Sequence, residues 1–131
     1  MPHITLEYSA NIEAKVSIAG FLKALQDAAL STGIAELAGF RTRAERREHY
    51  LVAGNPENCF VAITMRVARG RSPEELKNVR EVVTKAAIAY LEPVFASAPI
   101  SFSCEVQEII PEMRVNISNI REWAKKQEDA A

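Results

Sequence analysis

Residues 59–94, CFVAITMRVARGRSPEELKNVREVVTKAAIAYLEPV, decide the fold of this chain. The side chains of residues 59–67 alternate between two faces, which predicts a strand with apolar residues on both sides of a sheet. Ser72-Pro73-Glu74-Glu75 combines an N-cap, a proline at the first helical position and a capping-box glutamate. Residues 76–94 then repeat apolar side chains at three- and four-residue spacing. The stretch is therefore predicted to be a strand followed by a long helix.

A similar strand–helix pair precedes this stretch. Residues 2–8 alternate polar and apolar side chains, which predicts a half-buried strand. Residues 17–31 carry apolar side chains at helical spacing, with Ser17 as a natural N-cap and Gly33 as a natural stop. The first part of the chain thus has the same order of elements as the middle part.

Two more strands and a short helix complete the prediction. We expect a short strand at residues 49–53, which the turn residues 54–58 would join to the next strand as an antiparallel hairpin. Residues 101–109 alternate again and predict the last strand. Residues 118–131 are expected to form a short helix and a tail that frays from Lys125 onward.

This order of elements predicts an α+β fold, a two-layer α/β sandwich built from tandem β-α-β units. The four strands would form one mixed sheet, and right-handed crossovers would place both helices on one of its faces. The other face would stay bare. Because the 59–67 strand carries apolar residues on both faces, we expect other subunits to cover that bare face.

Composition limits the classes of function. A length of 131 residues fits a single domain, residues 1–131, and 48% apolar with 25% charged residues is typical of a globular protein. The net charge of −1, from 16 basic and 17 acidic residues, gives no reason to expect nucleic acid or an anionic membrane as a partner. Without a membrane-spanning run or a signal peptide, a cytoplasmic protein is expected.

The cysteines and histidines indicate neither a disulfide nor a metal site. Cys59 and Cys104 lie in apolar, strand-like surroundings and are interpreted as small core residues. His3 and His49 have no partners at the spacing of metal ligands.

Pro2 is a candidate catalytic residue. It follows Met1, and a methionine before such a small residue is normally removed, which would leave a free secondary amine at the start of a strand. An amine of this kind titrates near pH 8, and nearby cations lower its pKa into the range of a general base. With Met1 attached, the same nitrogen would be an amide without basicity. Taken alone, proline is also simply a common second residue.

Three arginines could provide the cations. Arg41 and Arg43 are two residues apart, so in an extended backbone both side chains point to one face. Arg71 directly precedes a helix N-terminus, which favours anions. A guanidinium group can hold a carboxylate with two hydrogen bonds. The alternative is that Arg71 is an ordinary surface residue, and for Arg46 and Arg47 we prefer a solvated charged loop answered by nearby glutamates.

Such a set of groups suits proton transfer. Like charge disfavours the ammonium form of an amine base, while the same arginines would bind substrate carboxylates and stabilise an enolate oxygen. An amine that takes a proton from an enol oxygen or a carbon and returns it to another carbon is an isomerase. This chemistry needs no metal and no organic cofactor.

The ordered set of motifs along the chain resembles the tautomerase superfamily, and more closely its 5-carboxymethyl-2-hydroxymuconate isomerase branch. The matching motifs are Met1-Pro2-His3-Ile4, Glu7, Asn11-Ile12, Thr32-Gly33-Ile34, Leu37-Ala38-Gly39-Phe40-Arg41-Thr42-Arg43, Gly70-Arg71-Ser72 and Asn116-Ile117-Ser118-Asn119-Ile120. The resemblance covers nearly the whole chain. Residues 44–58 do not match the pattern clearly, which puts the identity of the substrate in question.

The resemblance implies a homotrimer with active sites near subunit boundaries, and the conversion of a dienol hydroxymuconate to its keto isomer in the bacterial degradation of homoprotocatechuate. The partner would be a small anionic substrate. Pro2 would be the catalytic base, Arg41 and Arg71 would assist catalysis, and Arg43 and Arg71 would bind the substrate. Two alternatives remain: another 2-oxo acid enol or a halogenated acrylate as substrate, or a non-catalytic module that binds a small ligand.

Overall fold

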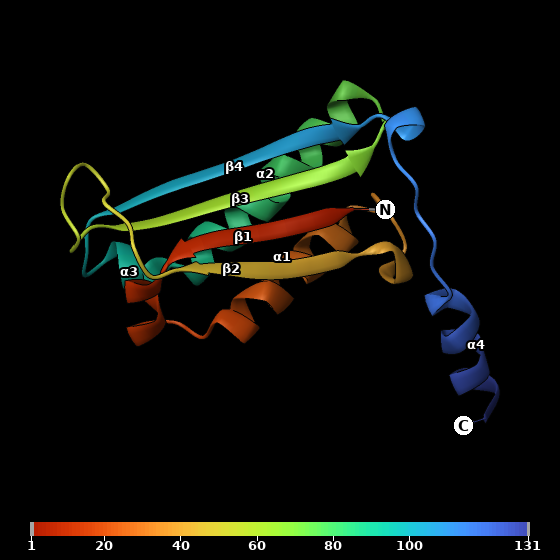
Figure 1. Ribbon diagram of the computed structural model, residues 1–131, viewed down its shortest axis with the longest axis horizontal. Helices are drawn as coiled ribbons and strands as arrows, with labels where there is room; N and C mark the ends of the chain where they lie inside the picture. Colours follow the sequence, from red (N-terminus) through yellow and green to blue (C-terminus); the bar gives the residue numbers. More distant parts are fainter. Residues whose placement is uncertain (1, 131) are drawn as a thin grey trace.

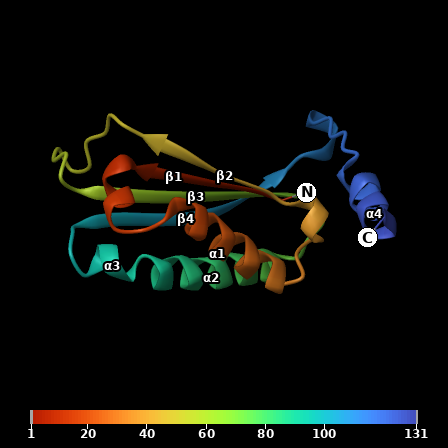
Figure 2. The same cartoon turned by 90° about the horizontal axis from the view of Figure 1, so that it is seen from below.

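A four-stranded sheet with helices packed on one face forms the body of the computed structural model, which describes residues 2–130. The helices α1 and α2 lie side by side under the sheet, and no element of the described residues covers its other face (Figures 1 and 2). The main elements in chain order are β1 (His3–Ser9), α1 (Ile18–Ser31), β2 (Arg41–Arg47), β3 (Cys59–Ala68), α2 (Pro73–Tyr90), α3 (Glu92–Phe95), β4 (Ile100–Ile109) and α4 (Ile120–Ala130). Short 3-10 helices are η1 (Ala10–Ala14), η2 (Leu37–Gly39) and η3 (Pro111–Met113).

The sheet contains two β-α-β units joined back to back. Its strand order is β2-β1-β3-β4, with β1 parallel to β2, β3 parallel to β4, and β1 antiparallel to β3. The predicted tandem units, the mixed sheet and the placement of both helices on one face are therefore confirmed. Within the sheet, the two units meet at the central pair of strands, β1 and β3.

The predicted strand at residues 49–53 is wrong, and so is the hairpin that would join it to β3. The second strand is instead Arg41–Arg47, which sequence reasoning took in part for a charged loop, and β1 separates it from β3. An edge strand can carry many charges because its outer edge and its uncovered face both meet solvent. Ala53 and Gly54 both have positive φ, of 54° and 74°, so the backbone turns there and cannot continue a strand.

Local signals set the two long helices. Ser17 caps α1 by accepting a hydrogen bond from the Gly20 amide, and the Ser72 capping box at the start of α2 is complete. Gly33, after the end of α1, has φ of 76°, which favours glycine. The inner faces of both helices pack on the alternating side chains of β1 and β3, and this layer forms the core.

The C-terminal segment differs from the prediction. Helix α4 continues to Ala130, so the expected fraying from Lys125 is wrong for the described residues, and Ala131 lies outside them. An extended segment, residues 114–119, connects η3 to α4, and we call it the arm. Figure 1 shows the arm and α4 projecting from the body at the end of the sheet where β1 begins. Neither of them contains a fully buried residue.

The uncovered face of the sheet is polar. Residues directly opposite one another on neighbouring strands point to the same side, so register gives the face as four rows. These rows are Arg41–His3–Arg66–Gln107, Arg43–Thr5–Thr64–Glu105, Glu45–Glu7–Ala62–Ser103, and a last one made of the two pairs Arg47–Ser9 and Phe60–Ser101. Basic groups are thus concentrated at the end of the sheet where β1 begins.

Two further features of the fold concern the helices and the cysteines. Within residues 2–130, no helix combines the length and the hydropathy that a membrane span requires. Both cysteines are free, with Cys59 buried and Cys104 half-buried.

Candidate active site at the start of strand β1

Pro2 lies directly before β1 and is buried. Its carbonyl oxygen accepts a hydrogen bond from the Arg41 amide at 3.0 Å, which extends the β1–β2 ladder by one bond. The parallel pairing of His3 with Arg41 continues this register. The sheet itself therefore brings the beginning of the chain next to the first predicted arginine.

The Arg41 side chain is half-buried and bridges three segments. Its Nη1 donates to the carbonyl oxygens of Ala38 and Phe40, both at 2.9 Å, and its Nη2 donates to Ser118 Oγ at 3.3 Å. The guanidinium group thus ties the loop before β2 to the arm. No described acidic residue forms an ion pair with Arg41.

Arg43 lies on the uncovered face and contacts His3. Arg43 Nη1 donates to His3 Nδ1 at 3.0 Å and to the Arg41 carbonyl oxygen at 3.3 Å. Because a guanidinium group can only donate, His3 Nδ1 must be the accepting nitrogen, and the imidazole is then neutral with its proton on Nε2. Arg41 and Arg43 therefore start from the same face of β2, but their guanidinium groups contact different partners.

Four guanidinium groups surround His3. Burial lowers the pKa of His3, and the charges of Arg43, Arg66, Arg114 and Arg41 lower this pKa further. None of the four arginines forms an ion pair with a described acidic residue, and Arg114 Nη1 is buried without a hydrogen-bond partner among the described residues. An uncompensated group of cations next to Pro2 would attract an anion to this end of the sheet.

Arg71 lines a cavity beside this group. The cavity has a volume of about 610 Å³ and lies between the body and the C-terminal segment. Its walls include Glu36, Ala38, Arg71, Asn116, Ser118 and Arg121. Its volume is in the usual range for small-ligand pockets. Pro2, Arg41 and Arg43 do not line it, but Arg41 hydrogen bonds to two of its wall residues, Ala38 and Ser118.

The guanidinium group of Arg71 has a structural task as well. Nη1 donates to the Ala68 carbonyl oxygen at 2.9 Å and Nη2 donates to the Ile34 carbonyl oxygen at 2.8 Å, which joins the loops after β3 and after α1. An arginine has five N–H donors, so three are left for a ligand. Arg71 is therefore not an ordinary surface residue, and only part of its guanidinium group is available to bind an anion.

Arg46 and Arg47 do not belong to the candidate site. Arg47 pairs with Glu7 and Glu45, both at 2.7 Å, and Arg46 pairs with Glu13 and Glu48 at 3.1 and 2.6 Å. Their pairing with nearby glutamates was predicted, although they lie on a strand and not in a loop. Both arginines are at the far end of β2 from Pro2.

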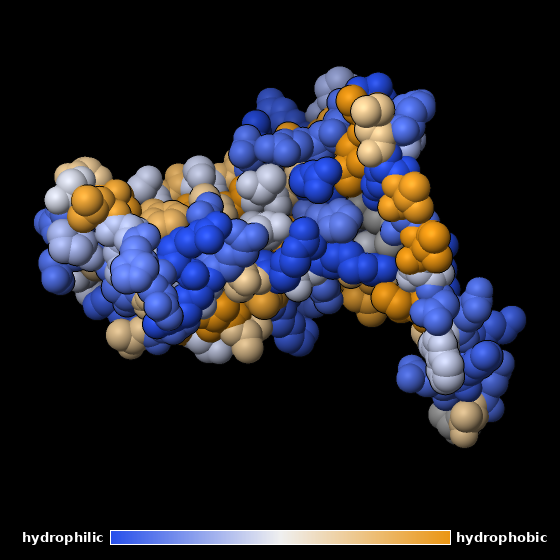
Figure 3. Space-filling model, viewed as in Figure 1, coloured by the Kyte–Doolittle hydropathy of each residue, from blue (hydrophilic) through white to orange (hydrophobic). Residues whose placement is uncertain are grey.

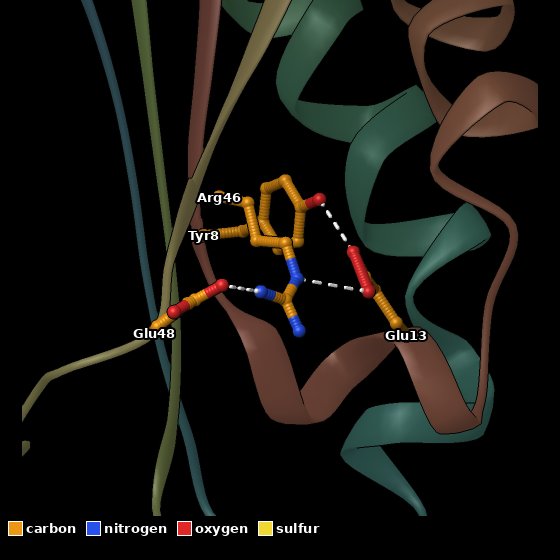
Figure 4. Close-up of polar contacts among 4 residues, drawn as sticks. All are labelled: Tyr8, Glu13, Arg46 and Glu48. Atoms are coloured by element: carbon orange, nitrogen blue, oxygen red, sulfur yellow. Dashed lines mark hydrogen bonds and ion pairs between the residues drawn. The ribbon is translucent and has the colours of Figure 1, made fainter.

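Figure 4 shows the polar cluster at that far end, where Tyr8 and Arg46 both point to Glu13. The Tyr8 hydroxyl donates to Glu13 Oε2 at 2.7 Å. Burial, followed by the bond to Glu13, raises the pKa of Tyr8 to about 12, while the same bond lowers the pKa of Glu13. Each of the four side chains drawn has a partner within the cluster, and these bonds fasten η1 to the sheet.

Sequence reasoning missed several residues of the site. His3 and Arg66 stand opposite each other on β1 and β3, a pairing that depends on a strand register that the sequence does not reveal. Glu36 and Arg121, both in the cavity wall, form an ion pair at 2.8 Å, and Asn116 also lines the cavity. The motif around Asn116 was part of the family resemblance, but nothing in its spacing predicted a role at the site. No group of three or more metal-ligating side chains occurs in the described residues.

Comparisons with known proteins agree with this geometry. The model of the 5-carboxymethyl-2-hydroxymuconate isomerase family matches residues 2–123. The chain is similar to 5-carboxymethyl-2-hydroxymuconate Delta-isomerase of Escherichia coli, with 26% identity over 121 residues that cover 92% of this chain and 96% of that protein.

Solved structures extend the comparison to the fold. A 5-carboxymethyl-2-hydroxymuconate isomerase from Deinococcus radiodurans R1 superposes with a TM-score of 0.86, at 26% identity, covering 94% of this chain and 93% of the other. A structure described as "Q0 fused 4-OT wild type symmetric trimer" superposes with a TM-score of 0.63, at 20% identity, covering 89% and 92%. The fold is that of the tautomerase superfamily. Together with the family match over almost its full length, this means that the chain belongs to the 5-carboxymethyl-2-hydroxymuconate isomerase family and is an isomerase.

Proposed function

We propose that this protein converts 5-carboxymethyl-2-hydroxymuconate to its keto isomer, with the free amine of Pro2 as the proton-transfer base and no cofactor. The observation that carries the proposal is the group of unpaired guanidinium groups around His3, the residue directly after Pro2. Burial is the first cause of the lowered pKa of His3, and the charges of the four arginines add a local potential that opposes positive charge. The same potential would hold a neighbouring secondary amine in its neutral, basic form.

The proton transfer would use Pro2 alone. After Met1 is removed, the neutral nitrogen would take the proton from the 2-hydroxyl group of the dienol and become an ammonium. The negative charge would then spread over the dienolate, and Pro2 would return the proton to a carbon atom of the conjugated chain. Bond breaking and bond making at one nitrogen leave the enzyme unchanged, so neither an oxidant nor a second substrate is required.

Arginines would bind and stabilise the anionic substrate. Arg41 would face the developing enolate oxygen. Its backbone amide is hydrogen bonded to the Pro2 carbonyl oxygen, and its guanidinium group has no acidic partner among the described residues. Arg43 and Arg71 would hold carboxylates, with Arg71 using the donors that the Ala68 and Ile34 carbonyls leave free. The substrate has three carboxylates, which fits several separated guanidinium groups.

We also propose that the active form is a homotrimer. The uncovered face of the sheet and the projecting arm are both exposed in the single chain, and a subunit contact would cover them (Figures 2 and 3). The similar structure described as a symmetric trimer supports the same assembly.

An ultraviolet assay that follows loss of the dienol tests the proposal. We expect turnover of 5-carboxymethyl-2-hydroxymuconate, and a lower kcat/KM for 2-hydroxymuconate, which lacks one carboxylate. Equal kcat/KM for the two substrates would show that the arginines do not select for the third carboxylate. No turnover of either substrate by protein whose Met1 is shown by mass to be removed would refute the proposed activity.

A further inference from the structure

One end of the uncovered face carries many hydrogen-bond donors and few acceptors. His3 on β1 lies directly opposite Arg66 on β3, and side chains at such positions are within contact distance of each other. Arg66 is exposed, and the start of the arm brings the charge of Arg114 close to the same imidazole. Arg114 Nη1 is buried without a hydrogen-bond partner among the described residues. Because a buried donor without a partner is costly, an acceptor is expected beside it.

The contact with Arg43 decides which nitrogen of His3 can donate. Arg43 Nη1 donates to His3 Nδ1 at 3.0 Å, so the neutral ring keeps its proton on Nε2. The Nε2–H group is then a donor at the end of the side chain. His3 therefore adds a neutral donor to the positive charges of Arg66 and Arg114.

Acidic side chains do not compensate this group. The two rows of the uncovered face nearest the start of β1 contain one acidic residue, Glu105, which forms no ion pair with another described residue. The neutral side chains in these rows, apart from His3, are Thr5, Thr64 and Gln107, and each of them can donate a hydrogen bond. A carboxylate only accepts hydrogen bonds, so it matches a surface of this kind.

The proposed base is at the same end of the sheet. Alternation along the strand directs the buried side chains of Pro2 and Ile4 to the helical layer and that of His3 to the uncovered face. The Pro2 nitrogen is at the very start of the strand, and no residue precedes it once Met1 is removed. A ligand at this nitrogen can therefore reach the uncovered face around the end of the strand. The arm crosses this end of the sheet as well (Figure 1).

We propose that His3, Arg66 and Arg114 form a subsite for the third carboxylate of the substrate, the carboxymethyl group that 2-hydroxymuconate lacks. The Nε2–H group of His3 and the two guanidinium groups donate to the carboxylate oxygens. Arg43 is a positioning residue for His3, because its bond to Nδ1 holds the imidazole in the donating tautomer. Arg43 retains further N–H donors for the carboxylate assigned to it above. This inference rests on the proposed function.

Kinetics with the two substrates test the subsite. For Arg66→Gln we expect kcat/KM for 5-carboxymethyl-2-hydroxymuconate to fall about 10- to 100-fold through a higher KM, the range for losing one hydrogen bond between charged groups. For 2-hydroxymuconate, kcat/KM should change less than about threefold, because only a screened long-range charge is lost. The matched control is Arg47→Gln, at the other end of the same face, which should leave the ratio of the two kcat/KM values unchanged.

Two variants of His3 separate the roles of its nitrogens. The amide group of asparagine overlaps the position of Nδ1, and the amide group of glutamine overlaps that of Nε2. His3→Gln keeps a donor at the end of the side chain, so it should retain most of the preference for 5-carboxymethyl-2-hydroxymuconate. His3→Asn should lose about tenfold of this preference. Equal losses in both variants would overturn the assignment of the Nε2 donor.

The tautomer of His3 can be measured without turnover. Nitrogen NMR of the imidazole near pH 7 distinguishes a proton on Nε2 from a proton on Nδ1. The variant His49→Gln removes the only other histidine and so identifies the signal. We expect the Nε2–H form in the parent and a measurable fraction of the Nδ1–H form in Arg43→Ala. A parent ring with its proton on Nδ1 would overturn the role given to Arg43.

Unreactive acids test anion binding separately from catalysis. Tricarballylate and glutarate have the same carbon chain, and only tricarballylate carries a carboxylate on the middle carbon. At constant ionic strength, calorimetry should give a Kd at least about tenfold lower for tricarballylate, and Arg66→Gln should abolish the difference. Equal Kd values for the two acids in the parent would overturn the subsite.

The outcomes separate this subsite from the proposed function. An inactive parent that prefers tricarballylate through Arg66 would refute the proposed function and support the subsite. An active parent whose Arg66→Gln variant keeps its preference for 5-carboxymethyl-2-hydroxymuconate would refute the subsite alone. An Arg66→Gln variant that loses kcat/KM equally for both substrates, or that only changes its sedimentation, would also refute the subsite.

Discussion

Replacing Arg71 by alanine separates its two tasks. Two hydrogen bonds from a charged donor to the Ala68 and Ile34 carbonyls would contribute about 1.5–3 kcal/mol each if fully buried. Arg71 is half-buried, so water can replace part of this, and we expect a loss of about 2 kcal/mol in the free energy of unfolding. For a chain of this length that corresponds to a fall in Tm of about 8 °C.

The same change should also remove a carboxylate partner from the cavity. Loss of one donor to a developing or bound anion costs roughly 100-fold in rate, so kcat/KM in the ultraviolet assay should fall by about that factor. The assay is run well below the lowered Tm, so that unfolding does not contribute. Arg69→Ala is the matched control, because Arg69 is an exposed arginine of the same loop, and it should change neither quantity.

The two readouts make the reasoning refutable. A variant that loses stability but keeps the parent's kcat/KM would show that Arg71 is only a clamp between two loops. A variant that loses kcat/KM with an unchanged Tm would show that the bonds to Ala68 and Ile34 contribute nothing to stability.

Three further predictions concern other parts of the molecule. Pro2→Ala should keep the fold but lower kcat by at least about 100-fold, because a primary amine is a differently placed base; unchanged turnover would remove Pro2 from the mechanism. The free energy of unfolding should fall as pH rises from about 10 to about 12, because the folded state raises the pKa of Tyr8. It should also fall on acidification through the range where the Glu13 carboxyl of the unfolded chain binds its proton, because the folded state lowers the pKa of Glu13. Thermal melts across pH should show that Tyr8→Phe weakens the pH dependence at the alkaline end and reduces it at the acid end. Gly20→Ala should destabilise the parent, because the new methyl group collides with the Tyr90 hydroxyl, but it should stabilise the Tyr90→Phe variant by about 0.5–1 kcal/mol. Denaturant titration of the parent, the two single variants and the double variant measures both effects of Gly20→Ala. Effects of the same sign in the two backgrounds would contradict this prediction.

The parts of the fold that sequence reasoning predicted correctly depend on local signals. The Ser72 capping box, the Ser17 cap and the alternation along β3 involve residues within a few positions of one another. These signals do not depend on what lies far along the chain. They were sufficient for the order of elements, the mixed sheet and the single helical layer.

The errors have a common physical cause. Arg41–Arg47 is a strand because β1 offers it a parallel edge with an open face, and only tertiary structure provides that edge. Residues 49–53 have the apolar character of a strand but no partner strand, and their only bridge is a short one between Val52 and Asn55. A short C-terminal helix was expected, but with fraying from Lys125, whereas α4 continues to Ala130 although none of its residues is buried.

The candidate site could be predicted only in part for the same reason. Pro2 was singled out by its position after Met1, and Arg41 and Arg43 by their two-residue spacing; the sheet brings the three residues to one end of β1 and β2. Arg66 and Arg114 reach His3 from distant parts of the chain, and the arm reaches Arg41 across 77 positions through Ser118. The carbonyl bonds of Arg71 likewise join loops that are far apart in sequence.

The proton-transfer account depends most directly on the chemical state of the Pro2 nitrogen. Two preparations of the same chain, one without Met1 and one that retains it, can be verified by intact mass and compared in the ultraviolet assay across pH. We predict turnover only for the chain that begins at Pro2, with kcat/KM falling as the amine becomes protonated at low pH. Equal kcat/KM for both preparations would contradict the assignment of Pro2 as the base.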